Sequence, residues 1–220
     1  MNGPRYGHMS IALSGFVYVF GGNGNQFQGM NEETCPLATC EVFDIQKEGW
    51  KLAAEMPIAV SFASVVSPRK NTFYVFGGQT NRQSVDNVQS FDTRTGEWAL
   101  LKLKMPQKLA TLGTALTSKS DIVVLGGEVW DPTQEPPRVD VESMLKLELE
   151  GMKWVKMPHM KMKRHFHIPV LYHNEKIYSL GKDHSEIFKE NSNTWTELHV
   201  GGDILLEKIE FESCSGCIVS

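Results

Sequence analysis

Hydrophobic residues along this chain gather in short runs, separated by glycine, asparagine, proline and charged residues. In the N-terminal part such runs cover positions 9–13, 16–20, 40–44 and 49–53. Their length and their content of valine, isoleucine, phenylalanine, tyrosine and tryptophan predict β-strands. The run at 16–20 carries no charged side chain, so we expect a strand that is buried on both faces.

The run at 16–20 ends in a pair of glycines, and this pattern of strand and glycine returns three more times. The first glycines lie 56, 49 and 55 residues apart, a period typical of small repeated structural units. We expect these glycines where the backbone and a neighbouring unit approach closely. They are Gly21, Gly22, Gly77, Gly78, Gly126, Gly127 and Gly181, the last followed by Lys182 instead of a second glycine.

Each unit then contains an apolar residue seven positions before a tryptophan. The pairs are Phe43 and Trp50, Phe91 and Trp98, Leu147 and Trp154, and Phe188 and Trp195. Between the members of the first two pairs, Asp44 to Gly49 and Asp92 to Gly96 predict tight turns, because aspartate bonds nearby backbone N–H groups and glycine tolerates positive φ. Length varies only in the polar segment after the glycines, as expected for loops on one face.

The recurring glycines and apolar–tryptophan pairs resemble the kelch repeat over about residues 4–200. The resemblance implies an all-β fold, a β-propeller of about four four-stranded antiparallel blades. We place the blades at about residues 4–55, 56–104, 105–157 and 158–200, in a propeller domain of residues 1–202 with a tail of residues 203–220. The family usually has tyrosine seven positions before the tryptophan, where this chain has phenylalanine or leucine.

Closure of the propeller is left open by the sequence. Kelch propellers usually close with five to seven blades, whereas four repeats are visible here. The chain either forms a small closed ring, at the lower limit for propellers, or an open arc of a larger propeller. An open arc exposes strand edges and apolar faces, which favours self-association. The run at 204–212 could add a closing strand.

The segments after the glycines are the expected binding surface, since loops on a rigid scaffold commonly carry binding residues. The longest are 23–39 and 128–139, and we expect them to share one rim with the links Met56-Pro57, Met105-Pro106 and Met157-Pro158. Trp130 is expected to be exposed there. The candidate binding residues are Asn23, Asn25, Phe27, Glu32, Glu33, Gln79, Arg82, Glu128, Trp130 and Arg138.

The net charge of −4 and the pI near 6.0 give no basic footprint, so we expect no nucleic-acid partner. The apolar runs are too short for a membrane span, and no secretory signal follows Met1, so a cytoplasmic location is expected. Without secretion, Cys35, Cys40, Cys214 and Cys217 are expected to be reduced thiols. The spacing of Cys214 and Cys217 is also that of a zinc ligand pair, but we expect no metal and no cofactor.

Two further motifs have both a structural and a functional interpretation. Arg164, His165 and His167 include a His-x-His pair that could bind a metal, yet Arg5 and His8 repeat the same Arg-x-x-His spacing. We interpret the repeated spacing as an arginine and a histidine that hold neighbouring blades together. The tyrosines that precede the first glycine by three positions are expected to belong to the core; they are Tyr18, Tyr74 and Tyr178.

The last four residues, beginning at Cys217, match a C-a-a-X prenylation box, and Cys214 could carry a second lipid. The glutamates at 207, 210 and 212 are the reverse of the basic residues that often support such an anchor. An accidental tetrapeptide or a closing strand is the alternative. Membrane association is expected only if Cys217 is prenylated.

These patterns favour a non-enzymatic protein-interaction scaffold or adaptor that presents its loops to a protein or peptide partner, with no catalytic residue assigned. The alternative is a kelch-like enzyme or metal protein that acts on a small molecule in a central cavity. Asp183, His184 and Glu128 are the residues to inspect for that alternative. The direction of the unrepeated polar residues, toward the axis or toward the loop rim, discriminates the two hypotheses.

Overall fold

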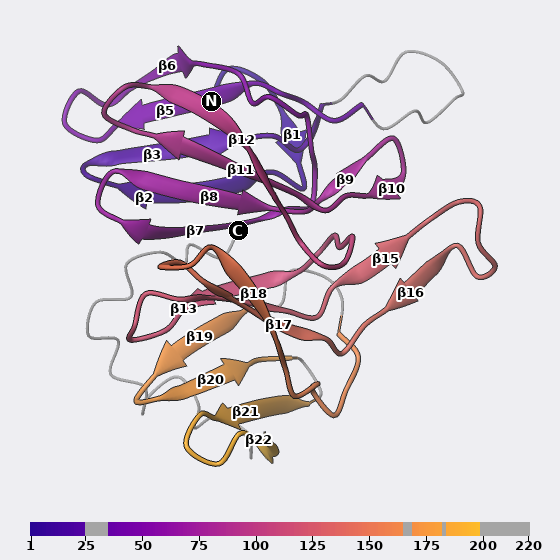
Figure 1. Cartoon of the computed structure of the whole chain (residues 1–220). Helices are drawn as coiled ribbons and strands as arrows, with labels where there is room; N and C mark the ends of the chain where they lie inside the picture. Colours follow the sequence, from indigo (N-terminus) through magenta and orange to yellow (C-terminus); the bar gives the residue numbers. More distant parts are fainter. Residues whose placement is uncertain (25–34, 165–168, 182–183, 199–220) are drawn as a thin grey trace.

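The structure, a computed structural model, describes residues 1–24, 35–164, 169–181 and 184–198 (Figure 1). Within these ranges the regular elements are all β-strands, and four of the sheets are antiparallel meanders of four strands. We call these sheets blades 1 to 4. No helix in this part of the chain is long and apolar enough to cross a membrane.

Each blade runs from its innermost to its outermost strand in chain order, and in blades 1 to 3 additional short strands lie between the second and third strands. Blade 1 consists of β2 (Met9–Leu13), β3 (Phe16–Phe20), β5 (Cys40–Asp44) and β6 (Gly49–Ala53). Blade 2 consists of β7 (Ser64–Arg69), β8 (Thr72–Phe76), β11 (Asn87–Asp92) and β12 (Glu97–Lys104). Blade 3 consists of β13 (Gly113–Leu116), β14 (Ile122–Leu125), β17 (Met144–Glu148) and β18 (Lys153–Met157). Blade 4 consists of β19 (Val170–His173), β20 (Lys176–Ser179), β21 (Ser185–Lys189) and β22 (Thr194–Leu198).

Three small two-stranded sheets complete the described strands. They pair β1 (Arg5–Tyr6) with β4 (Asn23–Gly24), β9 (Gln79–Thr80) with β10 (Gln83–Ser84), and β15 (Glu128–Trp130) with β16 (Arg138–Asp140).

The strands of blade 1 have the bounds predicted from the hydrophobic runs. The two tight turns are also confirmed, because an Asp44 carboxylate oxygen accepts the N–H groups of Gln46 and Lys47, both at 3.1 Å. In blade 2, Asp92 accepts the N–H of Arg94 at 2.8 Å in the same way. Each turn places the tryptophan opposite the apolar residue of the neighbouring strand; in blade 1, Trp50 lies opposite Phe43.

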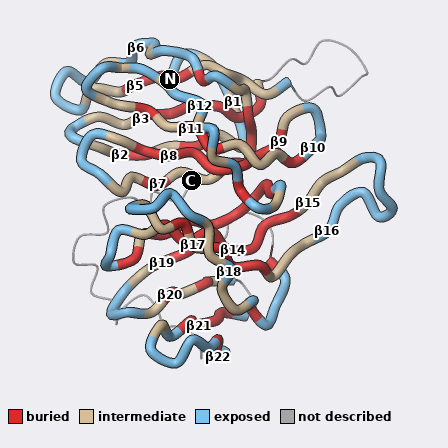
Figure 2. The backbone as a smooth tube through the Cα atoms, viewed as in Figure 1, coloured by how far each residue is buried: buried red, intermediate tan, exposed pale blue. Residues whose placement is uncertain are grey.

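Three hydrophobic cores lie between successive blades, and the second strand of each inner blade is the most deeply buried element (Figure 2). All four residues of β14 are buried, as are the last four of β8. The prediction that β3 is buried on both faces is only partly correct, because Phe16 and Val17 are half-buried.

Backbone hydrogen bonds join each blade to the next at the glycine pairs. The N–H of Gly22 donates to the carbonyl of Val60 at 2.9 Å, and Gly78 donates to Leu109 at 2.8 Å. Gly127 donates to Arg164 at 2.8 Å. These glycines have positive φ and leave no room for a Cβ atom, which explains why the repeat requires glycine there.

The described residues form an open arc. The innermost strands contact one another in series, β2 with β7, β7 with β13, and β13 with β19, whereas β19 makes no comparable contact with β2. Figure 1 shows the blades following one another in chain order, from indigo to orange. Of the two alternatives that the sequence left open, the described residues therefore adopt the arc.

Candidate interaction surface

The three small sheets project from the same end of the blades, on the right in Figure 1. We call this the loop end. It also carries the links between blades, since Met56 N–H bonds to Ala38 and Met105 N–H bonds to Asp86, both at 2.8 Å. The opposite end carries the short turns, such as 44–49 and 92–96, so the variable segments are gathered on one end, as predicted.

The β15–β16 hairpin extends furthest from the blades among the described hairpins (Figure 1). Its residues 132–139 are exposed. At its base the Arg138 guanidinium stacks on the Trp130 ring, 4.9 Å from the ring centroid, and its Nε lies 2.8 Å from Oε2 of Glu128. Glu128 is buried, so the hairpin holds an aromatic and a cationic side chain in a fixed arrangement.

Hydrogen bonds through Ser84 attach this hairpin to the smaller β9–β10 hairpin of blade 2. The Ser84 hydroxyl donates to the carbonyl of Glu128 at 3.2 Å and accepts the N–H of Trp130 at 2.9 Å. Ser84 is buried, which shields both bonds from water. The two hairpins thus form one continuous surface that spans two blades.

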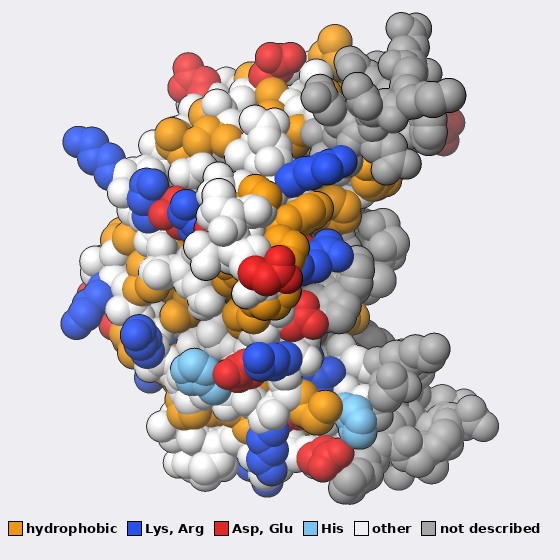
Figure 3. Space-filling model, turned by 90° about the vertical axis from the view of Figure 1, so that its right-hand side faces the viewer, with side chains coloured by type: hydrophobic (Ala, Val, Ile, Leu, Met, Phe, Trp, Pro, Cys, Tyr) orange, Lys and Arg blue, Asp and Glu red, His pale blue; other side chains and the backbone are white. Residues whose placement is uncertain are grey.

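Figure 3 views the molecule from the loop end and shows hydrophobic side chains in the middle of this face, with lysine, arginine and acidic side chains among them. A mixture of apolar and charged groups is ordinary for a surface that binds another protein transiently. A tryptophan and arginines are the residue types that contribute most often to binding energy in such surfaces.

A polar residue in the third strand of three blades anchors the segment that enters the blade. Gln89 accepts the N–H of Ile58 at 2.9 Å, Glu186 accepts the N–H of Lys161 at 2.9 Å, and Glu41 accepts the N–H of Asn2. In blades 1 and 4 this glutamate also pairs with a buried arginine: Arg5 Nη2 lies 2.7 Å from Glu41, and Arg164 Nη2 lies 3.6 Å from Glu186.

Comparison with known proteins agrees with this architecture. Residues 7–216 match the family described as KLHDC2/KLHL20/DRC7 Kelch-repeats domain. The chain belongs to the kelch-repeat family. Similar curated proteins include Kelch-like protein 25 of Xenopus tropicalis, 26% identical over 80% of this chain, and Kelch-like protein 38 of Rattus norvegicus, 25% identical over 82% of this chain.

This kelch chain spans about a quarter of the length of those relatives, with 28% and 27% of their residues covered. Among solved structures, one titled "Structure of YjhT" superposes with a TM-score of 0.72 at 16% identity, over 90% of this chain and 70% of that chain. At this identity the likeness concerns the fold alone.

The predicted loop residues of the kelch chain fall into three groups. Arg82 and Arg138 are exposed and Trp130 is half-buried, so Trp130 is less exposed than predicted, because Arg138 covers its ring. Three others are buried, contrary to their prediction as rim residues: Asn23, Gln79 and Glu128. Each follows a glycine pair and is paired with the entering segment of its own blade, so that its side chain lies inside. Asn25, Phe27, Glu32 and Glu33 lie outside the described residues.

Two of the three link methionines are not surface residues either, and the third, Met157, is half-buried. Met56 and Met105 are 4% and 3% exposed, whereas the prolines that follow them are exposed. Their side chains fill the space below the glycine pairs, as the proximity of the Met56 sulfur to Gly21 indicates. Sequence reasoning missed Ser84 as the link between hairpins, because a single serine in a polar segment carries no distinguishing signal.

The interpretation of Arg5 and Arg164 as ties between neighbouring blades is wrong for their side chains. Arg5 donates to the carbonyls of Gly21 and Thr39 and to Glu41, all in its own blade. Arg164 donates to the carbonyl of His184 at 2.6 Å, also in its own blade. The contact with the neighbouring blade is made instead by the backbone carbonyl of Arg164. His167 lies outside the described residues.

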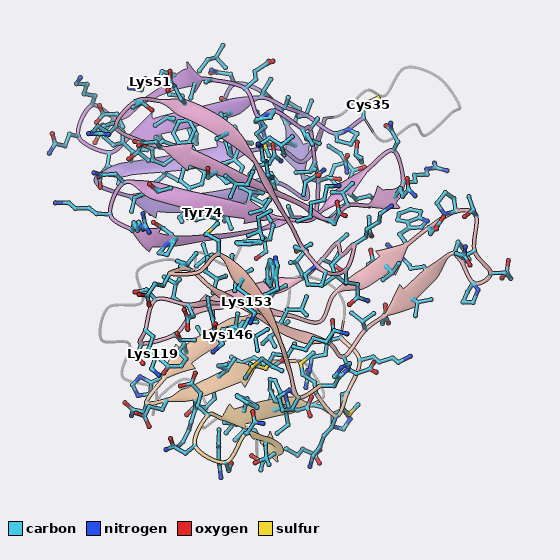
Figure 4. All side chains as sticks on the ribbon, viewed as in Figure 1. Cys35, Lys51, Tyr74, Lys119, Lys146 and Lys153 are labelled. Carbon is cyan, nitrogen blue, oxygen red and sulfur yellow. The ribbon has the colours of Figure 1, made fainter. Side chains whose placement is uncertain are left out.

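Burial shifts two titratable groups near Arg5. It lowers the pKa of His8, with a further contribution from the Arg5 charge. It also raises the pKa of the Cys40 thiol to about 12. Cys35, in contrast, is exposed beside the loop end, and Figure 4 labels it there. Cys214 and Cys217 lie outside the described residues.

The described residues that were singled out for the enzyme alternative each pair with a different side chain and do not form one group. Glu128 pairs with Arg138, and His184 Nδ1 lies 3.4 Å from Glu197 of its own blade. Asp183 lies outside the described residues. In the ranges that the structure describes, no three histidine, cysteine or acidic side chains are grouped as a metal site. Tyr18 and Tyr74 are core residues as predicted, and Figure 4 shows Tyr74 between blades 2 and 3.

Proposed function

We propose that this kelch chain is a non-enzymatic interaction module, a scaffold or adaptor whose loop end binds a protein or peptide partner. The observation that carries the proposal is the β15–β16 hairpin, which presents the stacked pair of Trp130 and Arg138 and is bonded to the hairpin that carries the exposed Arg82.

Rigidity supports a binding role for this surface. The Trp130 ring is fixed by the Arg138 stack, and the backbone N–H of Trp130 is bonded to the Ser84 hydroxyl. Little conformational freedom is therefore lost when a partner binds. The loop end as a whole rests on blades whose facing surfaces are buried. Binding residues held in place by a rigid scaffold are common in binding proteins.

Family membership supports protein binding in general terms. The curated relatives named above are kelch-like proteins, and this chain corresponds to one part of each. Their names do not specify a partner, so the surface itself must identify one. The partner should contact the Trp130 ring with its stacked Arg138 guanidinium and the exposed Arg82, which suits peptides with acidic and apolar side chains.

The test is quantitative affinity capture with three forms of the purified chain: wild type, the double variant Trp130→Ala/Arg82→Glu, and the control Arg94→Glu. Arg94 is exposed in the turn at the opposite end of blade 2, so the control changes a surface charge without altering the loop end. All three forms should give matching circular dichroism spectra.

We expect a set of proteins that is captured by the wild type and by Arg94→Glu and is depleted at least about tenfold with the double variant. Binding of one such protein should then be reproduced with purified components. Equal capture by all three folded forms would refute a binding role for the loop end.

A further inference from the structure

The interfaces between blades repeat the same residue positions. On each blade, a row of three residues across its first three strands faces the next blade; we call this the forward row. In blade 1 it consists of Ile11, Tyr18 and Val42, which are 1%, 6% and 3% exposed. The equivalent Val66 and Tyr74 of blade 2 are buried against blade 3.

Among the described residues, no further blade packs in front of the forward row of blade 4. The strand register identifies the forward row of blade 4 as Leu171, Tyr178 and Ile187. All three side chains are half-buried, whereas the row of blade 1 is buried, as are Val66 and Tyr74 of blade 2. Ser90, the third position of blade 2, is also half-buried. Blade 4 thus offers an apolar row with a central tyrosine, chemically the same as the row that blade 1 uses to bind blade 2.

Blade 1 shows the complementary condition on its other side. The backward row, which faces the preceding blade, consists in blade 2 of Phe73, Phe91 and Trp98, and the two phenylalanines are 0% and 2% exposed. In blade 1 the same positions are Val17, Phe43 and Trp50, which are half-buried or exposed.

The tryptophan of the backward row donates a hydrogen bond to the preceding link in blades 2 and 4, whereas Trp154 Nε1 of blade 3 is buried without a partner among the described residues. Trp98 Nε1 donates to the Ala54 carbonyl of the preceding link at 2.9 Å, and Trp195 Nε1 donates to Pro158 at 2.8 Å. Among the described residues no such acceptor lies near Trp50. Trp50 is 36% exposed, and its ring packs against Phe43 of the same row.

These two open rows are halves of an interface that the protein already builds three times. In the first interface the forward Tyr18 ring lies 5.5 Å from Phe73 and 5.7 Å from Phe91 of the backward row. We propose that the forward row of blade 4 binds the backward row of blade 1 of a second copy of this chain, with Tyr178 against Val17 and Phe43. The binding partner is a second copy of this chain, because every copy carries both rows and the contact repeats the interface between successive blades.

The resulting contact is head-to-tail, with different surfaces from the two copies. This geometry predicts how variants of the two rows should associate. A copy with a damaged blade 4 row keeps a working blade 1 row, and the reverse holds for a copy with a damaged blade 1 row. Two different damaged copies can therefore bind each other, although neither can bind itself.

The experiment is sedimentation velocity on the chain, of 24.7 kDa, over a concentration series. The forms are wild type, Tyr178→Asp, Trp50→Asp, an equimolar mixture of these two variants, and the control Leu100→Glu. Leu100 is an exposed apolar residue on the outer strand of blade 2, outside both open rows. Circular dichroism checks that each form is folded.

We expect the wild type and Leu100→Glu to associate, and each aspartate variant alone to associate at least about 100-fold more weakly. The mixture should return a species of twice the monomer mass and nothing larger, because only one contact per pair remains. That result also shows that both variants are folded.

Three results would overturn the proposal: a wild type that stays monomeric throughout the series, aspartate variants that associate as the wild type does, or a mixture that remains monomeric. The loop end plays no part in this contact. A failure here would leave the proposed partner binding intact, and loss of partner binding would leave this contact intact.

Discussion

A methyl group at Gly77 would collide with the carbonyl oxygen of Leu109, the same oxygen that accepts the N–H of Gly78. Gly77 has a φ of +60°, and Gly96 has a φ of +75° but nothing within 4 Å of an added Cβ. A side chain at Gly96 would therefore meet backbone strain alone, whereas a side chain at Gly77 would meet both backbone strain and a neighbouring blade. The close approach between blades is the added reason for glycine in the repeat.

Gly96→Ala should lower the free energy of unfolding by about 1 to 2 kcal/mol, the cost of a left-handed residue with a side chain. Gly77→Ala should cost about 3 kcal/mol or more, because blades 2 and 3 must also separate. Urea unfolding followed by tryptophan fluorescence measures both. Equal losses would mean that the close approach contributes nothing.

Arg5 and Glu41 form a buried ion pair in blade 1. Blade 2 has the uncharged residues Val60 and Gln89 at the equivalent positions, so the two blades can be compared. Arg5→Val leaves a buried carboxylate unpaired and should cost about 3 to 5 kcal/mol. Adding Glu41→Gln removes that charge and reproduces the polar anchor of blade 2. The double variant should therefore unfold at higher urea concentration than Arg5→Val. A double variant that is less stable than the single one would contradict this account.

Single residues also mark where sequence reasoning stops. Glu128 follows a glycine pair in a polar segment and was predicted as a binding residue of the loop rim, yet it is 1% exposed and paired with Arg138. Hydrophobic periodicity cannot reveal such a pair, because both partners lie outside the strands of the blade. The core positions Tyr18 and Tyr74 could be predicted because they recur three residues before the first glycine of their units.

At the scale of elements, the strands of the blades could be predicted because each is a run of β-forming residues between strong turn signals. The small β9–β10 and β15–β16 sheets were missed, since two or three residues with ordinary polar composition carry no periodic signal. Their existence depends on pairing across the loop and on bonds such as those of Ser84. Tertiary contacts, not local preference, therefore shape the candidate surface.

Ser84→Ala tests the coupling between these two hairpins. The substitution leaves the Trp130 N–H without its acceptor and should weaken local stability by about 1 to 2 kcal/mol. Hydrogen exchange in peptides covering β15 should accelerate, while exchange in the blade strands stays unchanged. Ser67→Ala, which removes bonds to Arg69 and Thr72 at the other end of blade 2, should leave β15 unaffected. Faster exchange at β15 in both variants would contradict the specific role of Ser84.

For the whole molecule, an open arc implies unequal stability among the blades. Blades 2 and 3 pack against a neighbour on each side, whereas in the described part of the chain blade 4 packs against blade 3 alone. Stability in such arrays is a sum of unit and nearest-neighbour terms, so a terminal unit opens more easily. The arc itself could not be derived from the repeats, because closure depends on the relative tilt of the blades.

Native-state hydrogen exchange should therefore show slow exchange in β8 and β14 and faster exchange in β20. The difference in opening free energy should be at least about 1 kcal/mol. The measurement is made on Trp50→Asp, so that contact between copies does not protect blade 4. Equal protection of β8, β14 and β20 would mean that the chain opens as a single unit.

The order of strands within each blade has a consequence for how the protein is made. Every four-stranded sheet is built from one continuous stretch, so blade 2 is complete as soon as Lys104 has left the ribosome. No strand waits for a partner encoded far downstream, which shortens the time that unpaired edges are exposed during synthesis. The chain can therefore fold in step with translation, each finished blade serving as the template for the next.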